Sequence, residues 1–298
     1  MDLGFLSKGV RLVRAYMDFV RQAEAEGLKI GEVVLREQEL ELETAQEMLL
    51  KRMRENLQVM RESVQKGLKG NLRSFSGLSG GEAAKVEARR LRGESLTGER
   101  FSGAIAKALA VAEVNASMGK IVAAPTAGSC GVLPAVILTV EEALGLPEEA
   151  SLLGLFSAAG LGMVIADRAT VSGAEGGCQA EIGSAAGMAA AAAVEMAGGS
   201  PEATAQAAAI AMKSFLGLVC DPVAGLVEVP CIKRNATAAA IALAAAEMVL
   251  AGIKSAIPVD EVIDTMADVG RQIPCSLRET AQGGLAATPT GRRIQLTI

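Results

Sequence analysis

Four of the five cysteines stand in three short segments rich in glycine or proline, and three of the four, Cys178, Cys220 and Cys231, are candidates for a shared site. Cys178 follows Gly176 and Gly177 at an expected helix start, where free N–H groups and the helix dipole favour a thiolate. Cys220 and Cys231 lie at the two ends of one irregular segment, VCDPVAGLVEVPC, which can fold back and bring both sulfurs together. Thiolates gathered in this way are typical metal ligands.

The sequence favours an iron-sulfur cluster over zinc at these cysteines. The chain contains no histidine, and no two cysteines have the short separation of a zinc knuckle. Iron-sulfur clusters accept widely spaced thiolates, and three thiolates on a four-iron cluster leave one iron open as a Lewis acid that can expel a hydroxyl group. The spacing alone leaves a second interpretation open, in which the cysteines are small buried side chains packed in the core.

Two further segments have the composition of anion-binding turns, because backbone N–H groups and hydroxyls suit a carboxylate. The predicted carboxylate-binding residues are Ser79, Gly80, Gly81, Thr126, Gly128 and Ser129. Lys233, Arg234 and Asn235, which come directly after Cys231, could face an acidic substrate or the charge of a cluster. Tight turns between helices and a solvated charged turn are the plainer interpretations of these segments.

The elements that position these segments are predicted to be helices. Half of the residues are apolar, alanine and glycine dominate the second half, and runs of valine, isoleucine and threonine are few, which favours closely packed helices over sheets. We predict a mainly α fold: one large helical catalytic domain with glycine-rich loops between helices that carry the cysteines. The expected helices are Phe101 to Met118, Ser151 to Ala166, Glu181 to Ala197, Pro201 to Val219, Thr237 to Ala251 and Asp260 to Gln272.

The first 70 residues are charged and amphipathic, which predicts a helical region (1–70) packing on a catalytic domain (71–298). One stripe recurs at spacings of three and four residues and ends before Gly70. Its members are Leu49, Met53, Leu57, Met60, Val64 and Leu68.

Composition excludes several classes of function. With a net charge of −5 and 2% aromatic residues, the chain lacks a basic or stacking surface for nucleic acid. Two apolar stretches, Ile121 to Val140 and Ser151 to Ala166, are not expected to span a membrane, since the first is interrupted by glycine and proline and the second is short. Met1 to Val20 lacks a signal-peptide pattern, and the odd number of cysteines does not suggest a disulfide framework, so we expect a cytoplasmic protein.

Five segments of this sequence closely resemble the α subunit of the two-chain, iron-sulfur-dependent L-serine dehydratases. They are SGLSGGEAAKV, VAAPTAGSCGVLPAV, SGAEGGCQAEIGSAAGMAAAA, LGLVCDPVAGLVEVPCIKRNA and LRETAQGGLAATPTG. The resemblance runs over nearly the whole chain, with Glu82 where the family often has aspartate.

The resemblance implies that Cys178, Cys220 and Cys231 hold a 4Fe-4S cluster with one open iron, and that Cys130 and Cys275 are not ligands. It further implies removal of water from L-serine to give pyruvate and ammonia, without pyridoxal phosphate, in an enzyme with a β subunit. The group that takes the α-proton stays open, and the candidates in this chain are Lys85, Lys233, Glu175 and Glu181. The alternatives are a hydroxide bound to the cluster and an imidazole that the β subunit supplies across the interface. Two alternative functions are an iron-sulfur L-cysteine desulfidase and a non-enzymatic helical scaffold subunit.

Overall fold

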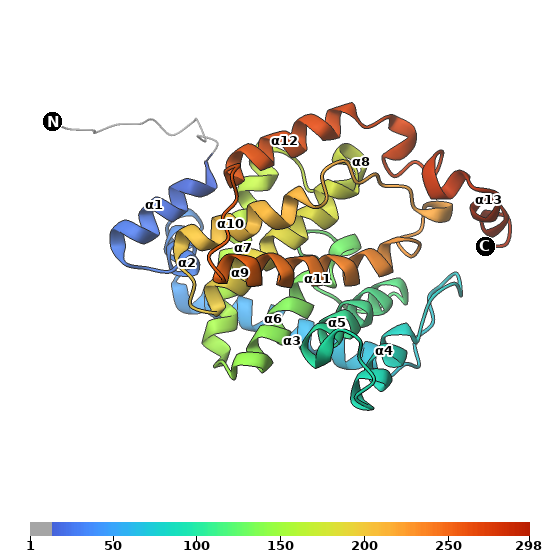
Figure 1. The fold of residues 1–298 in the computed structure, drawn as a ribbon, viewed down its shortest axis with the longest axis horizontal. Helices are drawn as coiled ribbons and strands as arrows, with labels where there is room; N and C mark the ends of the chain where they lie inside the picture. Colours follow the sequence, from blue (N-terminus) through green and yellow to red (C-terminus); the bar gives the residue numbers. More distant parts are fainter. Residues whose placement is uncertain (1–13) are drawn as a thin grey trace.

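The computed structural model describes residues 14–298, which form thirteen α-helices and several short 3-10 or π turns, and no β-strand occurs in this part of the chain (Figure 1). The predicted mainly α fold is confirmed. The helices are α1 (Tyr16–Glu26), α2 (Ile30–Glu41), α3 (Gln46–Leu68), α4 (Glu82–Leu91), α5 (Gly98–Ala116), α6 (Val132–Leu144), α7 (Glu148–Arg168), α8 (Gly173–Gly176), α9 (Ser184–Met196), α10 (Pro201–Lys213), α11 (Cys231–Leu250), α12 (Val259–Gln272) and α13 (Pro289–Gln295).

Helix α9 forms the centre of the molecule, and all thirteen of its residues are buried. Helices α6, α7, α10 and α11 pack around it (Figure 1). Its alanine-rich sequence permits this close approach because small side chains let neighbouring backbones come near. Gly187 shows how tight the packing is, since a Cβ at this position would lie 2.6 Å from Met212 Cγ of α10.

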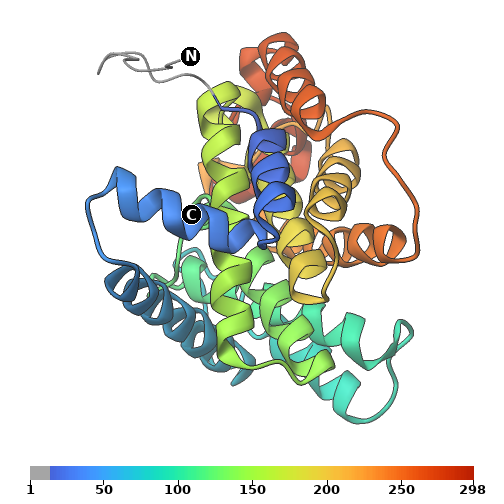
Figure 2. The same cartoon turned by 90° about the vertical axis from the view of Figure 1, so that its left-hand side faces the viewer.

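The N-terminal helices pack against the outer side of this core. Figure 2 shows α2 crossing the long helix α7, and α3 packs on α5. On α3 the predicted stripe faces inward, with Leu57 fully buried and Leu68 partly buried, so the predicted amphipathic helix is confirmed. The division into regions 1–70 and 71–298 stays a prediction, and residues 1–13 lie outside the described part of the chain.

Helix α6 was not expected, because the stretch that contains it is rich in glycine and proline. The helix begins at Val132 and places Pro134 in its first turn, where the missing N–H of proline has no intrahelical partner to lose. Helix α11 likewise begins at Cys231 instead of Thr237, directly after Pro230. Helix α10 ends at Lys213, before a turn at Gly217 with φ of 83°.

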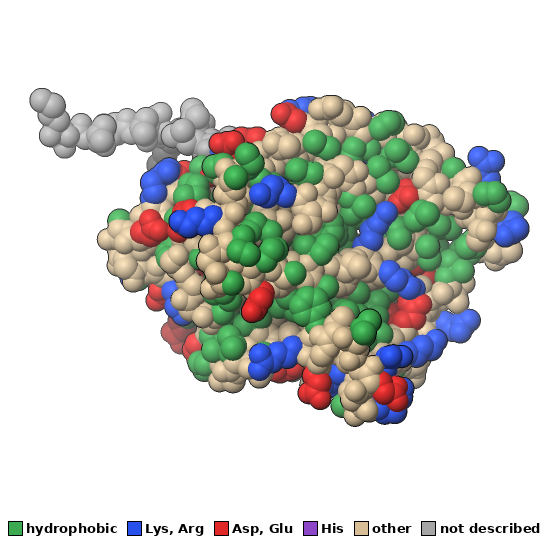
Figure 3. Space-filling model, in the orientation of Figure 1, with side chains coloured by type: hydrophobic (Ala, Val, Ile, Leu, Met, Phe, Trp, Pro, Cys, Tyr) green, Lys and Arg blue, Asp and Glu red, His purple; other side chains and the backbone are tan. Residues whose placement is uncertain are grey.

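By length and composition alone, two apolar windows could cross a membrane, Ala127–Leu144 and Glu148–Arg168. Within the protein, 72% of the first window and 61% of the second are buried, as in core helices of a folded domain. Figure 3 shows acidic and basic side chains interspersed over one face of the molecule. No continuous basic stripe is visible on that face.

Candidate functional site

The three cysteines predicted to hold a cluster are brought together and buried. Cys178 lies directly before the π turn Gln179–Gly183 that leads into α9, Cys220 follows α10, and Cys231 opens α11. Their exposed fractions are 1%, 3% and 6%, and all three are free thiols. The predicted helix start at Cys178 and the folding back of the Cys220–Cys231 segment therefore produce one shared site.

The sulfurs of this site differ in acidity. The Cys220 thiol hydrogen-bonds to Cys178, and this bond lowers the pKa of Cys178 and raises the pKa of Cys220. The Arg234 guanidinium beside Cys178 also lowers the pKa of Cys178, whereas burial raises the pKa of Cys231 to about 12. Cys178 is thus the sulfur that ionises first. The main cause is the neighbouring thiol, although the sequence suggested the helix dipole.

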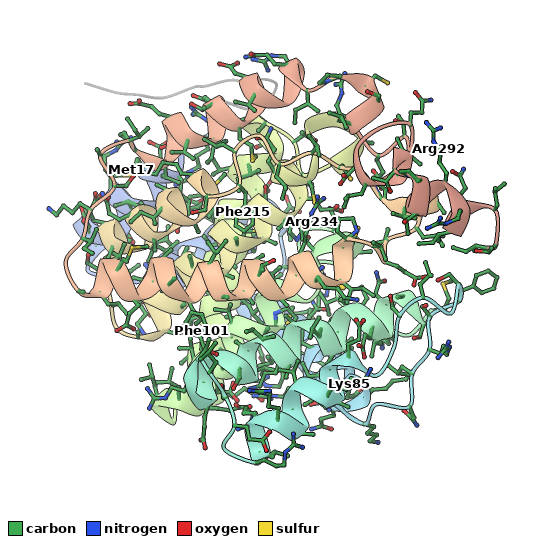
Figure 4. The ribbon with its side chains drawn as sticks, turned by 45° about the vertical axis from the view of Figure 1, so that its right-hand side comes forward. Met17, Lys85, Phe101, Phe215, Arg234 and Arg292 are labelled. Atoms are coloured by element: carbon green, nitrogen blue, oxygen red, sulfur yellow. The ribbon has the colours of Figure 1, made fainter. Side chains whose placement is uncertain are left out.

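Arg234 connects the cysteines to two other parts of the chain. Its Nη1 donates to Val219 O at 2.9 Å, and its Nη2 donates to Asp221 Oδ1 at 3.0 Å. The buried Asp221 also accepts a hydrogen bond of 2.8 Å from the N–H of Leu285. Figure 4 shows Arg234 at the first turn of α11. This ion pair therefore fixes the segment around Cys220 against α11 and the C-terminal segment.

The segment after α12 runs beside Cys220. The N–H of Cys220 donates to Leu277 O at 2.9 Å, and the N–H of Glu279 donates to Cys220 O at 2.7 Å. Arg278 Nη1 donates to the backbone carbonyl of Glu175 at 3.2 Å. Glu279 has a φ of 62°, in the left-handed region that non-glycine residues rarely adopt. These bonds hold Glu279 at the edge of the cysteine site.

Gly173 marks a small space in front of Cys220. A Cβ at this position would lie 3.1 Å from Cys220 Sγ, 3.3 Å from Glu181 Oε2 and 3.6 Å from Glu279 Oε2. A thiol from one segment and carboxylates from two others thus converge on one point. Gly173 contributes no side chain here, and we take the region around this point as the centre of the candidate site.

The other carboxylate oxygen of Glu181, Oε1, is held by a hydrogen bond. The hydroxyl of Thr126 donates to Glu181 Oε1 and is itself 3.1 Å from Ser129 Oγ. A Cβ at Gly128 would lie 2.6 Å from Glu181 Oε1, so only glycine leaves room for the carboxylate here. Burial raises the pKa of Glu181. The predicted segment around Thr126 therefore reaches the site, where its visible contact is with Glu181.

Asn235 supports the same turn from α11. Its Oδ1 accepts a hydrogen bond of 2.8 Å from the N–H of Gly131, and its Nδ2 donates to the carbonyls of Gly128 at 2.8 Å and Cys231 at 2.9 Å. The side chain is buried. These contacts show Asn235 positioning Gly128, while direct contact with a substrate stays a prediction.

The segment around Ser79 is ordered by hydrogen bonds within the segment and by a contact with Glu228, which is far away in the sequence. Ser76 Oγ donates to both carboxylate oxygens of Glu228 at 2.8 and 2.9 Å, which places the segment against the loop that precedes Cys231. Ser79 Oγ is buried and has no hydrogen-bond partner among the described residues. Gly80 has a φ of 136°, and a Cβ there would lie 2.2 Å from a backbone carbonyl oxygen.

The start of α4 already binds a carboxylate from within the protein. Glu113 of α5 accepts hydrogen bonds from the N–H groups of Gly81 at 3.1 Å, Glu82 at 2.6 Å and Ala83 at 3.1 Å. The N–H of Gly81, which was predicted to bind substrate, is therefore used inside the fold. The Ser79 hydroxyl has no partner among the described residues and remains available as a donor in this segment.

The four candidates for the base lie in different surroundings. Lys85 is exposed on α4 (Figure 4), and Lys233 binds both carboxylate oxygens of Glu82 at 2.5 and 2.6 Å. Glu175 is exposed and accepts a hydrogen bond of 2.6 Å from a neighbouring threonine hydroxyl. Of these candidates, Glu181 is the one whose carboxylate faces the space at Cys220.

Sequence reasoning missed Glu279, Asp221 and Glu113 as residues of this region. Glu279 and Asp221 lie inside segments that were recognised, RETAQGG and CDPVAG, so their motifs carried a signal. Glu113 is an acidic residue within the otherwise apolar run ALAVAEV of a predicted helix. A charge at such a position indicates a buried partner, although it does not say which one.

The donor set fits an iron-sulfur cluster. Three buried thiols surround a site in which one sulfur is biased toward the thiolate and a guanidinium lies close by, and thiolates are the ligands that such clusters take. Within residues 14–298, no three histidine, cysteine, aspartate or glutamate side chains are close enough to share one metal ion.

Comparison with known proteins identifies the family. Residues 25–286 match the family described as "Serine dehydratase alpha chain". The chain is 51% identical over 287 residues to the "Probable L-serine dehydratase, alpha chain" of Bacillus subtilis, covering 96% of this chain and 95% of that protein. It is 43% identical to the "L-serine dehydratase, alpha chain" of Peptoniphilus asaccharolyticus, covering 90% and 92%.

A longer relative matches over a smaller part of its length. The chain is 47% identical over 181 residues to "L-serine dehydratase TdcG" of Escherichia coli, covering 60% of this chain and 40% of that protein. The resemblance seen in the cysteine-bearing segments thus extends over nearly the full length of the alpha chains. This chain belongs to the serine dehydratase alpha chain family.

Proposed function

We propose that this chain is the α subunit of an L-serine dehydratase, a lyase that removes water from L-serine and releases pyruvate and ammonia. The observation that carries the proposal is the convergence of Cys220, Glu181 and Glu279 on one point at Gly173. The alpha-chain relatives, matched along nearly their entire length, support the same activity.

We further propose that Cys178, Cys220 and Cys231 hold a 4Fe-4S cluster. When bound, such a cluster supplies an open iron that acts as a Lewis acid toward the departing hydroxyl group. Cys130 is fully buried, and we place it outside the ligand set, as the family resemblance implies. Cys275 is exposed and also lies outside it. Pyridoxal phosphate has no part in this proposal.

Glu181 is the group in this chain that we assign to the α-proton. Thr126 holds Oε1, which leaves Oε2 directed at the space beside Cys220. As Oε2 takes the proton, the C–H electron pair forms the carbon–carbon double bond and the C–O bond breaks. The aminoacrylate that results then reacts with water to give pyruvate and ammonia. Burial favours the protonated form of Glu181 and thus strengthens it as a proton acceptor.

The substrate carboxylate is assigned to donors that the fold leaves unpaired. Ser79 Oγ is buried without a partner, and the segment that carries it is fixed next to the loop before Cys231. The hydroxyl of Ser129 and the backbone at Gly128 are the second group of predicted donors, although the Ser129 hydroxyl is already 3.1 Å from that of Thr126. An unpaired buried hydroxyl is costly, and a bound carboxylate would remove that cost.

A second subunit is part of the proposal. The two relatives that match along nearly their whole length are named as alpha chains, and the present chain has no histidine with which to move protons. We expect a β subunit to complete the enzyme, and we expect the complex in the cytoplasm. No observation favours the L-cysteine desulfidase or the non-enzymatic scaffold over the dehydratase.

The test is anaerobic reconstitution of the full chain, together with its β subunit, with iron and sulfide. We expect a brown protein whose paramagnetic resonance spectrum changes when L-serine is added and which forms pyruvate from it. Measuring sulfide release from L-cysteine in the same preparation distinguishes the desulfidase. A colourless, inactive protein with five free thiols would instead support the scaffold.

A further inference from the structure

The carboxylate of Glu279 is not paired with a basic side chain in the described part of the chain. Its carboxylate accepts no hydrogen bond and forms no ion pair within residues 14–298, although its backbone N–H is bonded to Cys220. Its neighbours at the site are Glu181 and Cys220, and the negative charge of Glu279 raises the pKa of both. Like charges therefore face one another across the space at Gly173.

The nearby arginines do not neutralise this charge. Arg234 is engaged by Asp221 and by Cys178, and Arg278 donates its Nη1 to the carbonyl of Glu175. The backbone of Glu279 also adopts the unfavourable φ of 62°. A site that concentrates negative charge and leaves it uncompensated is suited to a cationic ligand.

Glu279 lies where a ligand from solvent can reach it. Its side chain is exposed, and its Oε2 is 3.6 Å from the position that a Cβ of Gly173 would occupy. Glu181 lies further inside, with one oxygen already bonded to Thr126. The two carboxylates are therefore not equivalent: the inner one is placed for proton transfer, and the outer one is free to bind a charged group.

On the basis of the proposed function, we propose that Glu279 binds the ammonium group of the amino-acid substrate. An ammonium donates charge-assisted hydrogen bonds to a carboxylate, and these are among the stronger hydrogen bonds in proteins. L-Serine carries an ammonium on the carbon that loses its proton. Binding that ammonium at Glu279 thus brings the reacting carbon into the space that Glu181 Oε2 faces.

The experiment compares two ligands that differ only in the amino group. L-Serine carries the ammonium, and 3-hydroxypropanoate has the same skeleton without it. In the reconstituted enzyme, Glu279→Gln is expected to raise the KM for L-serine about tenfold or more, because a charged hydrogen bond is lost. The inhibition constant of 3-hydroxypropanoate should stay unchanged. Calorimetry of both ligands gives the same comparison without turnover.

Glu43→Gln is the matched control, because Glu43 is also an exposed glutamate with positive φ, at 48°, and lies between α2 and α3. Glu279→Asp retains the charge and should recover part of the L-serine affinity. An equal loss for both ligands, or no loss for either, would overturn the assignment of the ammonium while the dehydratase activity stands. A wild-type enzyme that does not act on L-serine would instead overturn the proposed function.

Discussion

The two ends of α9 hold partly or fully buried glutamates with opposite surroundings. Glu195, in the last turn, accepts hydrogen bonds from the N–H of Gly31 at 3.2 and 3.1 Å on its two oxygens and so binds the start of α2. Glu181, just before the first turn, has one oxygen bonded to Thr126 and the other facing Cys220 and Glu279. Both oxygens of Glu195 accept a backbone hydrogen bond, whereas, among the described residues, only one oxygen of Glu181 accepts a hydrogen bond.

This difference separates a structural carboxylate from a functional one. Burial raises the pKa of both groups, to about 7 for Glu195, so an elevated pKa alone does not identify the active residue. What distinguishes Glu181 is that its second oxygen lies next to Cys220 and Glu279 and has no hydrogen-bond donor among the described residues. Glu113 belongs to the structural kind, since it accepts three N–H groups at the start of α4.

The largest effect is expected at the cysteine end of α9. Cys220→Ser should abolish both the colour of the reconstituted protein and pyruvate formation, because serine is a poor ligand for iron that prefers thiolates. Visible absorption and a pyruvate assay measure the result. Cys130→Ser, at a buried cysteine outside the proposed ligand set, is the control and should keep both properties. Loss of colour in the control alone would contradict the assignment of ligands.

Replacing each glutamate by glutamine should distinguish the role of Glu181 from that of Glu195. Glu181→Gln should lower kcat by about 10²-fold or more with the cluster spectrum intact, because the group that accepts the proton is lost. Glu195→Gln should leave kcat of the folded enzyme unchanged and alter the free energy of unfolding. Both are measured by steady-state kinetics and denaturant titration. Equal losses of kcat in the two variants would remove the distinction between the ends of α9.

The smallest effect concerns the dependence of stability on pH. The folded protein holds the proton of Glu195 more tightly than the unfolded chain, because burial raises its pKa from 4.5 to about 7. The associated stability is fully present below the unfolded pKa and is lost as pH rises through about 7, a change of up to roughly 3 kcal/mol. The same sign applies to Glu113 and Glu181, whose pKa values are also raised.

Glu195→Gln should therefore reduce the fall in the free energy of unfolding between about pH 5 and pH 8 without removing it. Urea titrations of the wild-type chain and the variant across this range measure the difference. A variant whose unfolding free energy falls as steeply as that of the wild type would show that Glu195 ionises at an ordinary pKa.

Local patterns in the sequence predicted several features because they depend on neighbours along the chain. Helical spacing predicted the buried stripe of α3, and glycine and proline predicted the breaks that carry Cys178 and Cys220. Composition predicted the mainly α fold, and the motifs predicted the family. The start of α6 was missed because the sequence alone does not distinguish a proline in the first turn of a helix from a proline in a loop.

Contacts between distant residues were decided by the tertiary structure alone. Glu279 lies 59 positions after Cys220, yet a hydrogen bond of 2.7 Å joins their backbones. Glu113 occupies the helix start that sequence reasoning had reserved for a substrate, since a carboxylate on a neighbouring helix can satisfy the same N–H groups. The sequence by itself determined which residue types were available for the chemistry. Packing determined which of them meet, because that depends on how helices far apart in the chain fit together.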